Sequence, residues 1–120
     1  MATRTGFTVS QHFAGRPATV KATYDAILAA ARPLGPIGED PKKTSIHLTR
    51  KTAFAGIATR RASLILTLKS GTDIKSARIR RREQASAGRW HLEIELTNPQ
   101  DVDRELRTWL RNAYDLAAGR

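Results

Sequence analysis

The spacing of apolar residues changes twice along this chain, and this pattern limits the possible folds more than any other sequence feature. Residues 17–32 show a helical period near 3.6, residues 45–96 mostly alternate with a period of two, and residues 98–118 return to the helical period. The apolar face of the first helical segment consists of Val20, Tyr24, Ile27, Leu28 and Ala31. The chain therefore predicts a helix, a set of strands joined by short turns, and a second helix.

Strands are predicted at Ser45–Thr49, Ala53–Thr59, Ser63–Lys69, Ile74–Arg82 and Trp90–Leu96. Gly56 interrupts the second strand, which indicates a bulge or a close approach of another group. In the fourth strand, alternation points Ala77 and Ile79 inward and the arginines at 78, 80 and 82 outward. The side chains expected to face both helices are Leu64, Leu66, Trp90, Leu92 and Ile94.

Turn and capping residues mark the ends of these segments. Arg60 and Arg61 are expected to form the turn between the second and third strands. Asn98 is expected to cap the second helix, with Pro99 at its first position. A stiff loop after the first helix is predicted from Pro33, Gly35, Pro36, Gly38 and Pro41. The buried stripe of the second helix is predicted to be Val102, Leu106, Trp109, Leu110, Ala113 and Ala117.

Two amphipathic helices and a run of short strands need one shared interface. We therefore expect an α+β fold: a two-layer sandwich with a mostly antiparallel sheet of about five strands, two helices packed on one face, and the other face partly open. Residues 13–118 are expected to form this single domain, after a partly disordered N-terminal tail at residues 1–12. Within the polar first segment, Phe7, Val9 and Phe13 are expected to dock on the core.

The composition excludes some classes of protein. The chain has no cysteine, so it forms neither disulfides nor thiolate metal sites. It shows neither a signal-peptide pattern nor an apolar run of the roughly 20 residues that span a bilayer. We therefore expect a cytoplasmic protein.

Four short motifs carry a resemblance to a known family: Phe13–Gly15, Pro41–Ile46, Phe54–Ala55 and Pro99–Asp103. Over about residues 13–116 the chain resembles an uncharacterised bacterial family, domain of unknown function 5655. In that family the domain occurs alone or at the C-terminus of longer proteins, some resembling predicted transport proteins and others carrying restriction-type nuclease regions. The resemblance implies an accessory role, and it supplies no catalytic residues.

The positive charge of the chain is concentrated in its middle. Between residues 42 and 89 lie thirteen of the 21 Lys and Arg residues but only two acids, Asp73 and Glu83. A basic sheet predicts a polyanionic partner, with nucleic acid as the leading candidate, or a role in serving a protein partner that acts on nucleic acid. With no evident platform of aromatic side chains for stacking bases, the contacts are expected to reach the backbone. The candidate binding residues are Lys42, Lys43, Arg60, Arg61, Arg78, Arg80, Arg81, Arg82 and Arg89.

The arginines of residues 78–82 are the most specific candidates for this binding site. Arginines at alternate positions of a strand are about 6.5–7 Å apart, a spacing that suits successive phosphates. Glu93 and Glu95 point outward on the following strand and are expected to pair with Arg78 and Arg80. Such exposed ion pairs would reduce the net positive charge of the arginine cluster, and they would not by themselves indicate a function.

Two other functions are considered beside a non-enzymatic polyanion-binding module. Lys42, Lys43 and Thr44 could hold a phosphate or carboxylate, which would make the chain a small-ligand or peptide-binding module. His47 and His91 with Glu93 could serve an enzyme acting on an anionic substrate, or form a mixed nitrogen–oxygen metal site. Scattered histidines are more often plain surface residues. No catalytic motif is present, and we expect neither a metal nor a cofactor.

Overall fold

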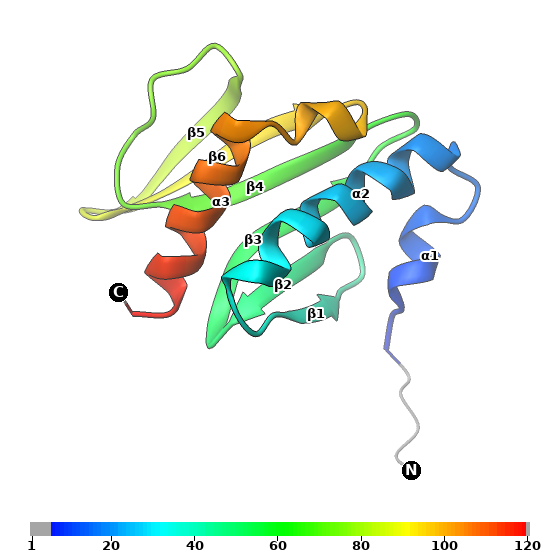
Figure 1. The fold of residues 1–120 in the computed structure, drawn as a ribbon, viewed down its shortest axis with the longest axis horizontal. Helices are drawn as coiled ribbons and strands as arrows, with labels where there is room; N and C mark the ends of the chain where they lie inside the picture. The colour runs from blue at the N-terminus through cyan, green and yellow to red at the C-terminus, as the bar shows by residue number, and fades with distance from the viewer. Residues whose placement is uncertain (1–5, 120) are drawn as a thin grey trace.

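The computed structural model describes residues 6–119, which form three α-helices and one six-stranded sheet (Figure 1). The α-helices are α1 (Val9–Phe13), α2 (Ala18–Ala31) and α3 (Arg104–Ala117), and two 3-10 turns are η1 (Arg32–Leu34) and η2 (Pro99–Asp101). The strands are β1 (Gly38–Pro41), β2 (Ile46–Arg50), β3 (Thr52–Thr59), β4 (Leu64–Ser70), β5 (Ile79–Ser86) and β6 (Arg89–Leu96).

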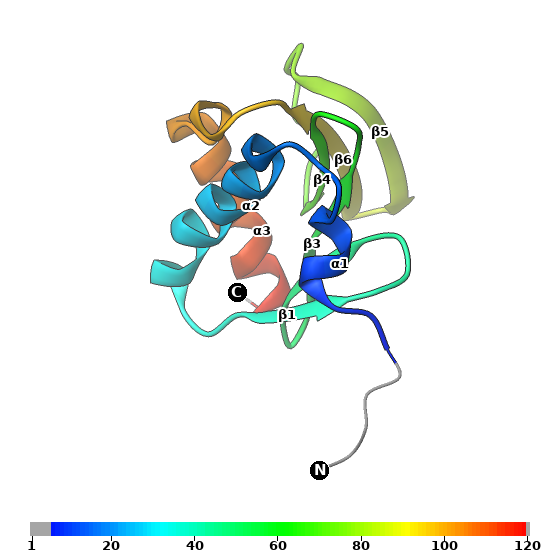
Figure 2. The ribbon, with the colours of Figure 1, turned by 90° about the vertical axis from the view of Figure 1, so that its right-hand side faces the viewer.

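The sheet is antiparallel throughout, with strand order β1-β2-β3-β4-β6-β5. Helices α2 and α3 lie together on one face, and the opposite face carries no helix among the described residues (Figure 2). The α+β class and the antiparallel sheet are thus confirmed, while the sheet has one strand more than predicted. No helix within residues 6–119 is long and apolar enough to cross a membrane.

The predicted core is formed as expected at most positions. Leu64, Leu66, Leu92 and Ile94 are buried beneath the helices, and Trp90 is partly buried against the same cluster. These residues pack against the buried faces of α2 and α3. All six residues of the stripe predicted for the second helix are buried, five within α3 and Val102 just before it.

Strand β1 was predicted as loop. Its four residues pair with β2, from Gly38 opposite Thr49 to Pro41 opposite Ile46. A proline is tolerated there because β1 is an edge strand. The buried hydroxyl of Tyr24 donates to Glu39 Oε1 at 2.6 Å, which ties β1 to α2. Burial of this hydroxyl, together with that hydrogen bond, raises the pKa of Tyr24.

Helix α1 is a short element that the sequence analysis did not predict. Thr8 and Gln11 form a capping box at its start. Val9 and Phe13 pack against the core as predicted, and the Phe13 ring lies 5.1 Å from that of Tyr24. The prediction for Phe7 is wrong, because that side chain is exposed. Residues 1–5 of the expected tail lie outside the described residues.

The second helix of the prediction is divided in two. Asn98 caps only the 3-10 turn η2, through its side chain and the N–H of Gln100. The N-cap of α3 is Asp103, whose carboxylate accepts from the N–H of Leu106 at 3.0 Å. The expected capping role of Asn98 at the long helix is therefore wrong, and an acid performs it instead.

Candidate anion-binding site

Strand β5 departs from the predicted arginine row. The strand begins at Ile79 rather than Ile74, and its register shifts between Ile79 and Arg81, so Arg80 is the extra residue of a bulge. After the bulge, Arg81 is opposite Glu93 and Arg82 is opposite Leu92. Directly paired residues share a face, so Arg82 lies on the helix side of the sheet. The alternating row on the open face is not formed.

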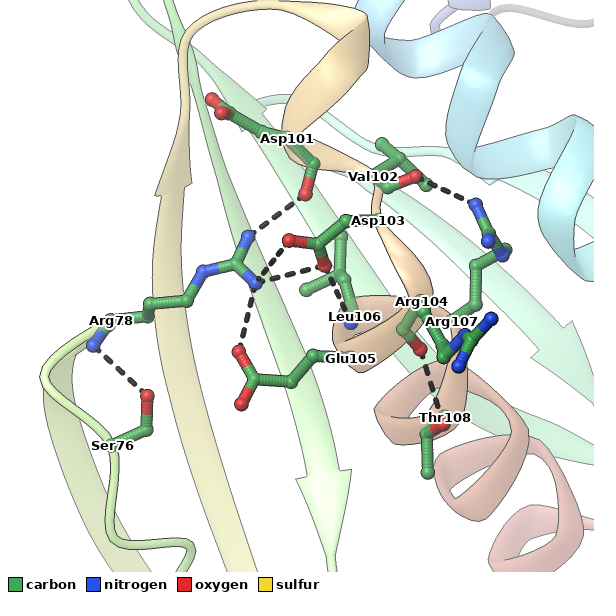
Figure 3. Close-up of polar contacts among 10 residues, drawn as sticks. All are labelled: Ser76, Arg78, Asp101, Val102, Asp103, Arg104, Glu105, Leu106, Arg107 and Thr108. Atoms are coloured by element: carbon green, nitrogen blue, oxygen red, sulfur yellow. Dashed lines mark hydrogen bonds and ion pairs between the residues drawn. The ribbon is translucent and has the colours of Figure 1, made fainter.

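Arg78 points toward α3, not outward. Its Nη1 lies 3.0 Å from Asp103 Oδ1 and 3.1 Å from Glu105 Oε1, and its Nη2 donates to the carbonyl of Asp101 at 2.8 Å (Figure 3). Its guanidinium also lies 5.6 Å from the centre of the Trp109 ring. Partial burial acts to lower the pKa of Arg78, but the bonds to the two carboxylates outweigh it and raise that pKa. Arg78 therefore joins the start of β5 to α3.

The expected partners of Glu93 and Glu95 are also corrected. Glu93 lies 3.7 Å from Arg81, and Glu95 accepts a hydrogen bond from Ser63 at 2.6 Å. Arg82 Nε bonds Asp73 at 2.7 Å. Hydrogen bonds from Lys75 and Arg82 hold the pKa of Asp73 below its usual range.

The open face of the sheet carries charges of both signs. Strand register places on it the acids Glu83, Glu93 and Glu95 beside the cations Lys69, Arg81 and Arg89. A polyanion approaching the centre of this face would meet carboxylates as well as cations. The open face is therefore not uniformly basic.

Five of the nine candidate cations form no ion pair with an acid within residues 6–119. They are Lys43, Arg60, Arg61, Arg80 and Arg89. Lys43 lies in the β1–β2 turn, and Arg60 and Arg61 lie in the β3–β4 turn. These two turns are neighbours at one end of the sheet, because β2 and β3 pair with Ile46 opposite Ile57 (Figure 1). We call Lys43, Arg60 and Arg61 the sheet-end cations.

A polar hollow of 320 Å³ lies beside the sheet-end cations. The hollow has no acidic residue in its lining, which consists of Gln11, His12, Arg16, Lys43, Thr44 and Thr59. Two hydrogen bonds hold α1 against the β1–β2 turn and the end of β3: His12 Nε2 to the carbonyl of Lys42 at 2.8 Å, and Thr59 Oγ1 to the carbonyl of His12 at 2.9 Å. Lys42 itself is paired with Asp40 at 3.0 Å. Of the predicted loop site, Lys43 and Thr44 thus line the hollow.

The sequence analysis missed Arg16 and Gln11 as candidates. Arg16 adds a second cation to the hollow, and no acid pairs with it among the described residues. The amide oxygen of Gln11 accepts from the N–H of Thr8 at 2.8 Å, which leaves its NH₂ group as a donor. The capping-box spacing of Thr8 and Gln11 was the available signal.

A second hollow, of 280 Å³, lies on the open face. His47 from β2 and His91 from β6 both line it, so the two histidines share this face. Glu93 is not among its lining residues, and within residues 6–119 no group of three or more potential ligands is arranged to hold a metal ion. The predicted combination of two histidines and a carboxylate is therefore not assembled in this hollow.

Comparison with known proteins identifies the family. The model of DUF5655, a domain of unknown function, matches residues 9–117, nearly the whole chain. The chain therefore belongs to the DUF5655 family. No curated protein and no solved structure matches the chain.

Proposed function

We propose that this DUF5655 domain is a non-enzymatic accessory module that binds a polyanion, the backbone of a nucleic acid, through its sheet-end cations. One observation carries the proposal: three candidate cations without an acid partner in the described structure gather in two neighbouring turns. Lys43, Arg60 and Arg61 are all exposed, and Arg16 extends the same surface. The proposal places the domain in the cytoplasm, where nucleic acids are accessible.

Ion pairing explains why the sheet end is favoured over Arg78, Arg81 and Arg82, since of the arginines at 78–82 Arg80 alone has no acid partner in the described structure. A cation already paired with a carboxylate must lose that partner, or share it, before it neutralises a phosphate. Arg78 and Arg82 are engaged with acids, and Arg81 lies near Glu93. The sheet-end cations have no such competition, so they release more counterions on binding. Backbone contacts of this kind carry little sequence information.

The expected salt dependence follows from the number of contacts. Each neutralised phosphate of a duplex contributes a slope of about −0.9 in log K against log salt. Three contacts therefore weaken binding about 40-fold between about 50 and 200 mM salt. This dependence separates polyanion binding from the recognition of one small ligand.

The test compares two triple variants with the same net charge. One replaces Lys43, Arg60 and Arg61 with alanine, and the other replaces Arg80, Arg81 and Arg89. Fluorescence polarisation measures affinity for duplex DNA, single-stranded DNA and RNA at two salt concentrations. We expect the first variant to flatten the slope by about two to three units, and the second to change it less. Equal losses would show that only net charge matters, and no binding by the wild type would refute the proposal.

The polar hollow supports a second candidate, the capture of a small anion. Its lining offers the cations Arg16 and Lys43 with side-chain donors and no acid, which suits a phosphate or carboxylate. Calorimetric titration with inorganic phosphate and pyrophosphate tests it. Salt-tolerant binding that is lost in Arg16→Ala, with Arg60→Ala unaffected, would favour this candidate over polyanion binding.

A further inference from the structure

Gly56 leaves a gap in a row of side chains that crosses the open face. His47, Gly56 and Thr67 are directly paired on β2, β3 and β4. The backbone does not require glycine there, because Gly56 is not among the residues with positive φ. A Cβ at this position would lie 3.7 Å from His47 Cδ2, which is an ordinary van der Waals contact. Glycine inside a strand costs stability and often marks the close approach of another group.

The gap continues into a hollow of a size that suits one flat ring. Ala53 and Ala58 also line it, so little side chain extends from the β3 floor. The axes of β2 and β4, on either side of β3, are about 9–10 Å apart. The imidazole of His47 stands at one wall of this 280 Å³ space.

The opposite side of the hollow carries a cation that is available to a ligand. Lys69 and His91 are cross-strand partners, and both line the hollow. Among residues 6–119, Lys69 has no acid within ion-pair distance. Thr67 adds a hydroxyl that can donate or accept. An occupant that fits these groups is planar, has polar edges and carries a negative charge nearby.

One end of the hollow lies near the sheet-end cations, which do not themselves line it. Ser45 and Ala58 line its end, and each lies two residues from a sheet-end cation, Lys43 or Arg60. Two residues of a strand span about 6.5–7 Å. A group in the hollow and a phosphate at the turns can therefore belong to the same or adjacent nucleotides.

From these placements we infer that the open-face hollow is a subsite for an unpaired nucleobase, so that the polyanion bound by this domain is a single strand. The inference rests on the proposed function. The base stacks against His47 over Gly56, its polar edge faces Thr67 and Lys69, and its backbone reaches the sheet-end cations. Bases inside a duplex are paired and stacked, and cannot enter the hollow.

Filling the gap tests the subsite without disturbing the fold. Gly56→Val places a side chain in the hollow at a position where a β-branched residue suits the strand. Gly56→Ala is the milder change, and Gly88→Ala is its matched control, because a Cβ at Gly88 meets nothing within 4 Å and lies outside the hollow. The probes are a fluorescein-labelled oligothymidylate and a duplex of the same length, at about 50 mM salt.

We expect the wild type to bind the single strand more tightly than the duplex. Gly56→Val and His47→Ala should each weaken single-strand binding about fivefold or more and leave duplex binding unchanged. The thermal midpoint of Gly56→Val should not fall, because a β-branched residue replaces a strand glycine. A 2-aminopurine within the oligothymidylate should be quenched by the wild type and not by His47→Ala.

Each other outcome overturns the inference in a distinguishable way. Equal binding of both probes, unaffected by Gly56→Val, would refute the base subsite and leave polyanion binding intact. No binding of either probe would refute the proposed function as well. A wild-type dimer in analytical ultracentrifugation that Gly56→Val converts to monomer would assign the hollow to a second copy of the chain instead.

Discussion

Replacing Arg78 with alanine should destabilise the domain more than replacing any other arginine of residues 78–82. Arg78 is the cation that connects the start of β5 with the N-terminus of α3 (Figure 3). Its side chain is 27% exposed, whereas those of Arg81 and Arg82 are 67% and 37% exposed. The alanine variant removes the link and leaves the two acids Asp103 and Glu105 close together.

The magnitude follows from the contacts of Arg78. The bond to the carbonyl of Asp101 has a charged donor and contributes about 1 kcal/mol or somewhat more. The pairs with Asp103 and Glu105 involve half-exposed carboxylates and together contribute about 0.5–1 kcal/mol. The contact with the Trp109 ring adds about 0.5 kcal/mol. Arg78→Ala should therefore lower the free energy of unfolding by about 2 kcal/mol.

Urea denaturation measures this change, since urea, unlike guanidinium, does not screen ion pairs. Arg80→Ala is the matched control, because Arg80 is an exposed bulge residue without an ion pair in the described structure. We expect the control to lie within about 0.5 kcal/mol of the wild type. Equal unfolding free energies for Arg78→Ala and Arg80→Ala would refute the role assigned to Arg78.

Three further predictions concern stability. Trp109→Ala should cost about 3–5 kcal/mol by calorimetry, because that side chain is 9% exposed, and a variant as stable as the wild type would contradict its place in the core. The N–H of Leu106, with help from Arg78, holds the pKa of Asp103 below its usual range. The stability that ionised Asp103 contributes is therefore present at neutral pH and is lost below about pH 4. Asp103→Asn should flatten the dependence of urea unfolding on acid pH. Gly35→Ala should destabilise by about 1–3 kcal/mol in the same assay, since its φ is 147° and a Cβ would overlap the Tyr114 hydroxyl, and an unchanged midpoint would refute this.

Elements with a clear periodicity were predictable from sequence. Helix α2 and strands β2, β3, β4 and β6 lie within a residue or two of their predicted bounds. Strand β1 was not predictable, because Gly38–Pro41 has no alternation and becomes a strand only by pairing with β2. The bulge at Arg80 was missed for a related reason: alternation assumes a regular register, which the partner strand alone can change.

The candidate site was predictable in residue type but not in arrangement. Composition alone identifies the basic middle of the chain. Composition does not reveal which arginine pairs with which acid. Arg78 pairs with Asp103 only because β5 begins beside α3. The polar hollow likewise combines side chains from α1, the α1–α2 connection, the β1–β2 turn and the end of β3. Such convergence depends on topology, so Arg16 was not distinguishable from other surface cations.

An NMR titration tests the central claim, that the sheet-end cations form the polyanion-binding surface. Amide resonances are followed while a short oligonucleotide is added at low salt. We predict that the largest shifts occur at residues 42–45 and 60–63 and at Arg16, and that they disappear in the variant lacking Lys43, Arg60 and Arg61. Shifts concentrated at residues 79–89, or the absence of any shift, would contradict the account.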